Sequence, residues 1–287
     1  MTGAPPTLCD ASALAALVQR LAGAPAIALD TEGNSFHAYT ERVCLIQIGL
    51  PGEEFLVDPL AVDPRPLAPI LADPARRLLF HGGDFDVRSL RRDFGFSFGR
   101  VFDTMIAAQV LGLPELGLAG LLRTRLGVRI EKGEQRSDWG RRPLSAQQLR
   151  YAAADVRFLG KLADGLDAEL TARGKQGEAA RRFEGLRHVV AREKRFDAEG
   201  WRRLREAPSL GPDEAGLLRR IWVAREELAR ALDRPPFKVI GERVMVEIAR
   251  RRPRDAEDLR RIPGVSELFV RRLGAAIVAQ PPREDVG

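Results

Sequence analysis

The segment that decides the fold is "AIALDTEGNSFHAYTERVCLIQIGLPGEEFLVD", residues 26–58. It holds three runs rich in apolar residues, "AIALD", "RVCLIQIGL" and "EFLVD", which are separated by stretches containing Gly, Pro and Asn. Short runs of this kind, without the helical spacing of apolar residues, are typical of β-strands. The segment therefore predicts a β-meander, a set of three consecutive antiparallel strands.

The residues that follow alternate short strands with helices. "RRLLFHG" and "RVFD" predict two more strands, and each is followed by apolar residues at helical spacing. Residues 145–170 predict one long helix, which Ser145 caps and whose apolar residues form a single stripe. Strands interleaved with helices predict an α/β fold in which helices flank a mixed sheet.

The C-terminal part of the chain differs in charge and in pattern. From Thr171 to the end there are 27 Lys and Arg against 19 Asp and Glu, a net charge of +8, whereas the first 170 residues carry −2. We expect an α/β domain over residues 1–172, a helical linker over 173–208 and a bundle of short helices over 209–287. The basic excess indicates nucleic acid as a partner, although solvated arginines on helix faces would give the same composition.

The composition argues against several other classes of protein. The chain is 45% hydrophobic and 30% charged, as is usual for soluble globular proteins. No apolar run approaches the roughly 20 residues of a membrane span, and the N-terminus lacks the pattern of a signal peptide. Two cysteines, Cys9 and Cys44, are too few for a disulfide framework or a zinc set. We expect a cytoplasmic monomer that does not contact membranes.

Two carboxylates end the first strand of the meander. Asp30 and Glu32 are two residues apart, so their side chains can point to the same side of the sheet. Such a pair repels itself unless a positive charge lies between the two groups. A divalent cation would supply that charge, and carboxylate oxygens favour Mg²⁺ or Mn²⁺ over zinc. Solvated acids at a strand-to-loop turn are the alternative interpretation.

Two later motifs carry further acids. "HGGDFD" places Asp84 and Asp86 at a helix start, where they could equally serve as an N-cap and as a first-turn charge. "YAAAD" places Tyr151 and Asp155 four residues apart on one helix face, which would also suit a half-buried tyrosine beside a surface acid. Taken with the first pair, these acids and the tyrosine could build one metal centre.

In this order the motifs resemble those of a known family. D-T-E at Asp30–Glu32, H-x₄-D at His81–Asp86 and Y-x₃-D at Tyr151–Asp155 resemble the three exonuclease motifs of the DEDD superfamily, tyrosine subclass. "EKGEQRSDWGRRPLSAQQLRYAAADVRFL" is similar to the matching part of ribonuclease D. The C-terminal bundle resembles an HRDC domain, with Trp222, Arg225, "DRPPFKVI", "IARRRP" and "LRRIPGV" as its cues. The resemblance implies a ribonuclease H-like mixed sheet with flanking helices, followed by one small all-helical HRDC bundle.

The resemblance also implies an activity. It is that of a metal-dependent 3′-5′ exoribonuclease that hydrolyses the terminal phosphodiester and releases 5′-mononucleotides, in the 3′-end processing of tRNA precursors or other structured RNA. Asp30, Glu32, Asp86 and Asp155 would bind two divalent ions, Mg²⁺ or Mn²⁺, and Tyr151 would orient the attacking water. The same chemistry on DNA is one alternative. A catalytically silent nucleic-acid-binding scaffold is another, against which the presence of all five residues argues.

The substrate contacts are less well defined by the sequence. Gly33 and Asn34 follow D-T-E, where ribonuclease D commonly has Phe, so the aromatic for the terminal base would come from one of the next two aromatic residues. The histidine of the second motif could contact substrate or simply complete a turn, and the tryptophan of the loop before the catalytic helix could pin that loop to the core. The candidate contacts are Phe36, Tyr39, His81, Lys132, Gln135, Trp139, Arg141 and Arg142.

Overall fold

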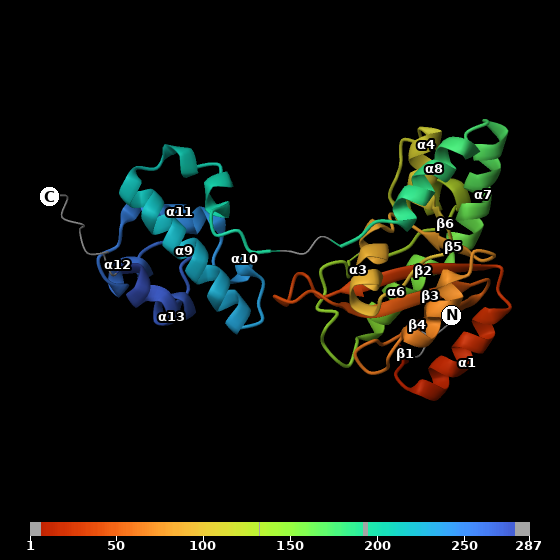
Figure 1. Cartoon of the computed structure of the whole chain (residues 1–287), viewed down its shortest axis with the longest axis horizontal. Coiled ribbons are helices and arrows are strands. Elements are labelled where there is room, and N and C mark those ends of the chain that lie inside the picture. Colours follow the sequence, from red (N-terminus) through yellow and green to blue (C-terminus); the bar gives the residue numbers. More distant parts are fainter. Residues whose placement is uncertain (1–6, 132, 192–194, 279–287) are drawn as a thin grey trace. The chain divides into compact units, whose positions relative to one another are not determined.

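The computed structural model describes residues 7–131, 133–191 and 195–278. The chain forms two compact units, shown in Figure 1. Unit 1 comprises Met1–Asn34 and Arg42–Arg192, and unit 2 comprises Ser35–Glu41 and Glu193–Gly287. Among the described residues, no helix is both long and apolar enough to cross a membrane.

Unit 1 is built on one mixed sheet, in which the described residues form six strands. The strand order is β1-β4-β3-β2-β5-β6. β2, β3 and β4 pair antiparallel, as the meander predicts, whereas β1 pairs parallel with β4, and β5 pairs parallel with β2 and β6. The strands are β1 (Thr7–Leu8), β2 (Ala26–Gly33), β3 (Val43–Leu50), β4 (Glu53–Val57), β5 (Arg77–Phe80) and β6 (Arg100–Asp103).

Helices pack on both faces of this sheet. On one face, α1 (Ala11–Ala22), α2 (Ala68–Ala72) and α3 (Asp84–Phe94) share a core with the alternate residues Ile27, Leu29, Ile46 and Ile48 of β2 and β3. The opposite face is covered by α4 (Thr104–Leu111), α5 (Leu118–Leu126), α6 (Ala146–Arg157), α7 (Leu159–Ala172) and α8 (Gln176–Arg187). The period-two alternation of a strand therefore turns Asp30 and Glu32 away from the α1 and α3 side.

Two sequence predictions differ from this structure. The helix predicted over residues 145–170 is two helices, because Phe158 between α6 and α7 has a non-helical backbone with φ −109° and ψ 0°. Apolar spacing continues across the break and so gives no signal of it. The predicted linker over 173–208 is not a separate body, since α8 buries Ala179 and Phe183 in the core of unit 1.

Unit 2 is an all-helical bundle. Its core includes Leu218, Ile221, Met245, Ile248 and Phe269. The helices are α9 (Pro212–Ala231), α10 (Pro236–Val239), α11 (Glu242–Arg251), α12 (Ala256–Arg260) and α13 (Glu267–Val278). Two 3₁₀ turns precede them, η2 (Gly200–Arg203) and η3 (Ala207–Ser209). A further 3₁₀ turn, η1 (Arg65–Leu67), belongs to unit 1.

The segment Ser35–Glu41 is also part of unit 2. The Tyr39 hydroxyl donates to Glu226 at 2.6 Å, and the Tyr39 ring lies 5.6 Å from the Arg230 guanidinium carbon. Asp233 accepts hydrogen bonds from the backbone N–H groups of Tyr39 and Thr40. These contacts give Tyr39 a structural function within unit 2.

Gly49 allows α6 to lie directly on β3. A Cβ atom added at Gly49 would be 2.8 Å from the carbonyl oxygen of Val156 and 3.2 Å from the Cβ of Ala28. Because Val156 follows Asp155 on α6, the distance at this contact sets how closely Asp155 approaches the strand that carries Asp30. A glycine at this place is therefore a requirement of packing rather than of backbone conformation.

We expect Gly49→Ala to destabilise unit 1 by about 1–3 kcal/mol, because the added methyl group forces α6 away from β3. Urea unfolding followed by circular dichroism measures the change. Gly23→Ala is the matched control, since a Cβ there meets nothing within 4 Å and its φ of −88° suits alanine. Equal unfolding midpoints for the two variants would contradict the close approach of α6.

Candidate metal centre

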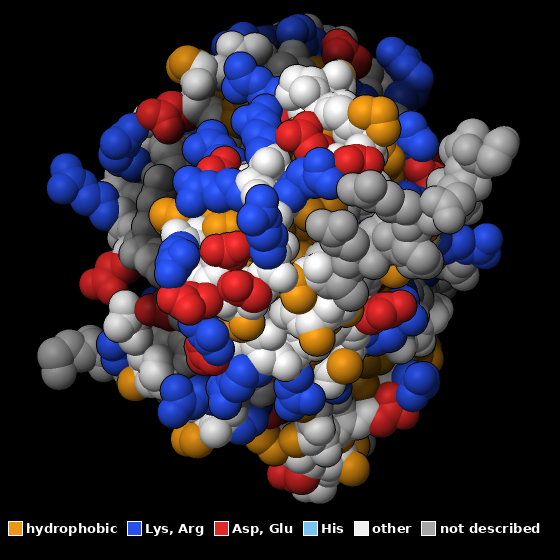
Figure 2. All heavy atoms as spheres, turned by 90° about the vertical axis from the view of Figure 1, so that its left-hand side faces the viewer, with side chains coloured by type: hydrophobic (Ala, Val, Ile, Leu, Met, Phe, Trp, Pro, Cys, Tyr) orange, Lys and Arg blue, Asp and Glu red, His pale blue; other side chains and the backbone are white. Residues whose placement is uncertain are grey.

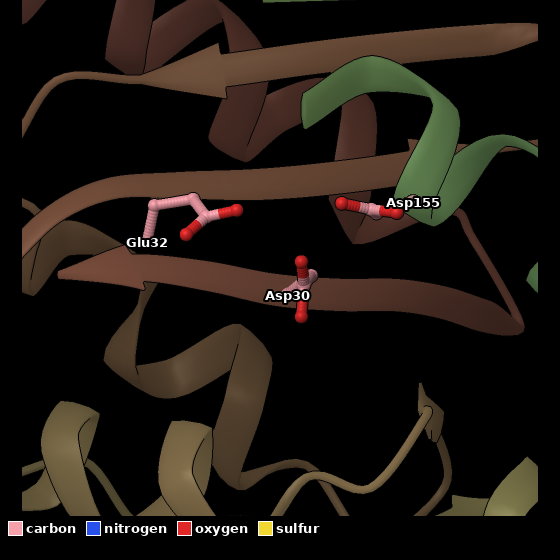
Figure 3. Close-up of side chains that lie close together, drawn as sticks. All are labelled: Asp30, Glu32 and Asp155. Atoms are coloured by element: carbon pink, nitrogen blue, oxygen red, sulfur yellow. The ribbon is translucent and has the colours of Figure 1, made fainter. Parts of the chain in front are cut away.

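Three carboxylates from two elements meet on one face of the sheet. Asp30 and Glu32 extend from β2, and Asp155 extends toward them from α6 (Figure 3). One oxygen of each side chain lies within 4.8 Å of one oxygen of each of the others. Residues far apart in the sequence thus form one cluster, as the D-T-E and Y-x₃-D motifs predict.

The start of α6 fixes the helix that delivers Asp155. Ser145 is its N-cap: the Ser145 hydroxyl accepts from the N–H of Gln148, and the Gln148 side chain accepts from the N–H of Ser145. This reciprocal capping box satisfies two donors at the helix start. Ala152 and Ala153 are fully buried, and their small side chains let the helix pack closely on the sheet.

Asp86 lies beside the cluster but is held by a different partner. Its Oδ1 accepts a hydrogen bond of 2.6 Å from the hydroxyl of Thr31, the residue between the two acids of β2. Its neighbour Asp84 is exposed and pairs with Arg88 at 2.6 Å. The N-cap of α3 is Gly83 rather than Asp84, so the predicted alternative of N-capping by Asp84 does not hold. Asp86 remains the acid of this motif that faces the site.

Burial and mutual repulsion make these acids hard to ionise. Burial, followed by the charge of Asp155, raises the pKa of Glu32 to about 9, and burial raises the pKa of Asp155 to about 7. Burial likewise raises the pKa of Asp86 to about 6, and burial together with the neighbouring acids raises the pKa of Asp30 well above its usual range. No Lys or Arg of the described residues lowers any of these pKa values.

The cluster therefore fits a divalent cation. Buried carboxylates without a basic partner are stable in the ionised form only when another positive charge is present. The donor atoms are all carboxylate oxygens, which suit Mg²⁺ and Mn²⁺ better than zinc. Asp30, Glu32 and Asp155 are the residues that would hold the ion, with Asp86 adjacent.

The cluster opens into a cavity of about 290 Å³. Asp30 and Asp155 line it together with Tyr151, His81 and Gln135, three further residues predicted for the site. The lining also includes the start of α5, at Gly117–Ala119. Burial and the charge of Asp155 raise the pKa of Tyr151, so its hydroxyl stays protonated at neutral pH and can orient a water molecule but is a poor base.

His81 is held in one tautomer by its neighbours. The Thr104 hydroxyl donates to the carbonyl oxygen of Phe80 at 3.1 Å, so it accepts from Nδ1–H of His81 at 2.9 Å. Burial lowers the pKa of His81, which favours the neutral ring. Nε2 is then an acceptor, and it is buried without a hydrogen-bond partner among the described residues.

Two of the predicted substrate contacts have structural partners instead. Trp139 has an exposed fraction of 0%, and its indole N–H donates to the carbonyl oxygen of Glu134. Arg142 donates to Asp58 at 2.6 and 2.7 Å and to the carbonyl oxygens of Cys44 and Trp139. Both residues hold the loop before α6, and for Trp139 this is the structural alternative that the sequence analysis left open. Arg141 is exposed, and Lys132 lies outside the described residues.

The aromatic residues near the end of β2 lie in different parts of the structure. Phe36 and Tyr39 belong to unit 2, and neither lines the cavity. Phe85 on α3 directly precedes Asp86, is 41% exposed, and its ring lies 3.5 Å from where a Cβ of Gly33 would be. Phe85 is therefore an exposed aromatic side chain beside the end of β2 that the sequence analysis did not single out.

Residues on β3 also contribute without having been predicted. Gln47 lies directly opposite Asp30 in the antiparallel register, and its amide is 3.5 Å from the Asp30 carboxylate. The signal for Gln47 is a single polar residue in an otherwise apolar strand. Gly49 gives no comparable signal, because its importance depends on which helix packs above it.

Metal-free protein should lose stability as the pH rises. The pKa values of the cluster are raised above their unfolded values of about 4, so the folded state binds more protons between roughly pH 5 and pH 9, and stability falls across that window. Mg²⁺ should offset the repulsion, so we expect the melting temperature to rise more with Mg²⁺ at pH 8.5 than at pH 6.

Thermal melts in EDTA and in MgCl₂ measure this difference. Glu32→Gln should reduce the pH dependence, whereas Asp164→Asn, which changes an exposed acid of unit 1, should leave it as in the unaltered chain. The same Mg²⁺ effect at both pH values would mean that protons and metal do not compete for these carboxylates.

Comparisons with known protein families agree with the fold of both units. A family model described as 3'-5' exonuclease matches residues 7–171, and one described as HRDC domain matches residues 214–280. The first match covers more than half of the chain and contains the acids of the cluster and Tyr151.

Individual relatives agree with these matches. The chain is 34% identical to Ribonuclease D of Acidiphilium cryptum over 90% of its own length and 66% of that protein, and 32% identical to Ribonuclease D of Sphingobium indicum over 91% and 68%. It thus spans about two thirds of the length of these relatives.

Solved structures lead to the same family. The catalytic core of RRP6 from Trypanosoma brucei matches with a TM-score of 0.87 and 28% identity over 96% of this chain and 81% of that one. The RNase D of Escherichia coli, described as an exoribonuclease involved in structured RNA processing, matches with a TM-score of 0.73 and 30% identity over 98% and 74%. The chain therefore belongs to the ribonuclease D family of 3′-5′ exoribonucleases.

Proposed function

We propose that this chain removes 5′-mononucleotides from RNA 3′ ends with two divalent ions, Mg²⁺ or Mn²⁺, bound by Asp30, Glu32, Asp86 and Asp155. One observation carries the proposal: Asp30, Glu32 and Asp155, each partly buried, bring their oxygens within 4.8 Å of one another without a basic partner among the described residues. The cost of that arrangement is explained if the function requires bound cations.

The residues of the site have distinct functions in this proposal. Bound cations would neutralise the carboxylates and stabilise the charge that develops on the oxygens of the scissile phosphate. Tyr151, protonated and close to Asp155, would orient the attacking water. Thr31, which lies between Asp30 and Glu32 on β2, holds Asp86 by a hydrogen bond, and Asp86 would supply the fourth carboxylate.

We infer that the substrates are structured RNAs such as tRNA precursors, bound partly by unit 2. Figure 2 shows basic side chains spread over the face it presents, interspersed with acidic ones. Arg260 and Arg261 of "RRIPGV" pair with Glu267 and Glu257, which makes them weaker candidates for phosphate contact than their sequence motif indicates. Exposed Arg272 on α13 forms no ion pair with described residues and is a better candidate.

The same proposal includes a setting for the enzyme. A cytoplasmic monomer would meet RNA precursors directly, and the free thiols of Cys9 and Cys44 are compatible with a reducing compartment.

We further propose that His81 contacts a sugar hydroxyl of the terminal nucleotide. The neutral ring has its only free acceptor at Nε2, so the group that it binds must be a donor. Phosphate oxygens are acceptors and are excluded as its partner, whereas the 2′- and 3′-hydroxyls of ribose are donors. A contact to the 2′-hydroxyl would distinguish RNA from DNA.

Asp30→Asn should lower the rate of 3′-end trimming at least about 100-fold. Loss of a residue that binds the metal directly should lower the rate more than loss of a residue that only hydrogen-bonds to such a ligand. The assay follows 5′-labelled RNA and DNA of one sequence in Mg²⁺ and in Mn²⁺ and identifies the released nucleotide. Unchanged trimming by the variant would refute the metal centre. Equal rates on the two polymers would favour the alternative of a DNA exonuclease.

His81→Phe should abolish the preference of the enzyme for RNA whose terminal nucleotide carries the contacted hydroxyl over RNA that lacks it. We expect the unaltered enzyme to cleave an oligonucleotide lacking the contacted 2′- or 3′-hydroxyl roughly tenfold more slowly than intact RNA, in line with one hydrogen bond, and the variant to cleave both alike. Single-turnover rates on intact, 2′-deoxy and 3′-deoxy ends decide which hydroxyl is involved. His188→Ala, which changes an exposed histidine of unit 1, is the control. If His81→Phe still cleaves the deoxy end more slowly than intact RNA, His81 does not contact that hydroxyl.

A further inference from the structure

Gln47 is a polar side chain in a place that favours apolar ones. All eight residues of β3 are buried, and the exposed fraction of Gln47 is 0%. Its neighbours in the strand, Ile46 and Ile48, are fully buried apolar residues of the core. An amide loses its hydration in such a position and must find hydrogen-bond partners within the protein.

Those partners are few. Gln47 lies opposite Asp30 in the register of β2 and β3, and its Nε2 donates to Oδ2 of Asp30 over 3.5 Å, a long hydrogen bond. The NH₂ end faces the carboxylate, because the opposite orientation would bring two oxygens together. Oε1 has no partner among the described residues. Gln47 is therefore poorly explained by the stability of the fold.

Its position relative to the carboxylate cluster is better defined. Residues directly opposite each other in an antiparallel pair point to the same face, so Leu45, Gln47 and Gly49 share the face of Glu32, Asp30 and Ala28 respectively. Leu45 and Gly49 have no side-chain donor. Gln47 is thus the side chain of β3 that donates a hydrogen bond to the cluster, and its acceptor is Asp30.

We propose that Gln47 is a positioning residue that holds the Asp30 carboxylate in the orientation needed to bind a divalent cation. The contact occupies Oδ2 and restrains rotation of the carboxylate, while Asp30 keeps its second oxygen for a ligand. This inference rests on the proposed metal centre, since a positioning residue acts only through the group that it orients.

Gln47→Met tests this role, because methionine preserves the volume and removes the donor. We expect Mn²⁺ affinity, measured by calorimetric titration with the metal alone, to fall roughly tenfold. Stability to urea should stay the same or rise, since the variant buries no unpaired amide. Activity at limiting Mn²⁺ should fall and recover at saturating Mn²⁺, with the KM for RNA unchanged.

Two further variants keep the test decisive. Ile46→Val, which removes a methylene from the opposite face of the same strand, should lower stability slightly and leave Mn²⁺ affinity unaltered. Asp30→Asn combined with Gln47→Met should bind Mn²⁺ no more weakly than Asp30→Asn alone, because the amide then has no ligand to orient. If the methionine variant does not fold, Gln47→Leu replaces it in every measurement.

The outcomes separate this inference from the proposed function. Mn²⁺ binding by Gln47→Met equal to that of the unaltered chain would overturn the positioning role and leave the metal centre intact. Failure of the unaltered chain to bind Mn²⁺ at all would overturn both, since Asp30 would then have no cation to hold.

Discussion

Repulsion among partly buried carboxylates is the constraint on which the rest of unit 1 depends. Asp30, Glu32 and Asp155 would separate in a flexible chain, and burial first and neighbouring acids second raise their pKa values. The hydrophobic contacts of Ile27 and Leu29 on the other face hold β2 in place against that repulsion. Strain of this kind persists only where the surrounding structure determines the geometry, and it is typical of functional sites.

β3 has a larger part in the site than its apolar sequence indicates. One face of this strand packs in the core with Ile46 and Ile48, and the other face supplies a donor to Asp30 at Gln47 and a place for α6 at Gly49. The antiparallel pairing with β2 converts these sequence positions into contacts with specific acids. The strand is thus both the wall of the core and the floor of the cluster.

The sequence was sufficient to predict the elements whose signals are local. The meander, the capped start of α6 at Ser145 and the motifs containing Asp30 and Asp155 all depend on spacing within a few residues. The sequence could only leave two roles open for Trp139 and gave no sign of the partners of Arg142, because an indole or a guanidinium suits a substrate and a loop anchor equally well until its partners are known. Gly49 and Phe85 depend on which distant element lies above or beside them, and one sequence does not contain that information.

The net charge of the sequence likewise does not predict which arginines of unit 2 are available to a polyanion. The excess of arginine in the C-terminal part indicates an acidic partner, yet Arg260 and Arg261 form ion pairs with neighbouring acids. Exposed ion pairs of this type add little stability, so they can open when a phosphate competes for the guanidinium, but each then leaves a carboxylate behind. In the proposed function, an arginine without such a partner would contribute to RNA affinity without leaving an unpaired carboxylate. The location of charge relative to acids, rather than its sum, therefore determines where a polyanion would bind.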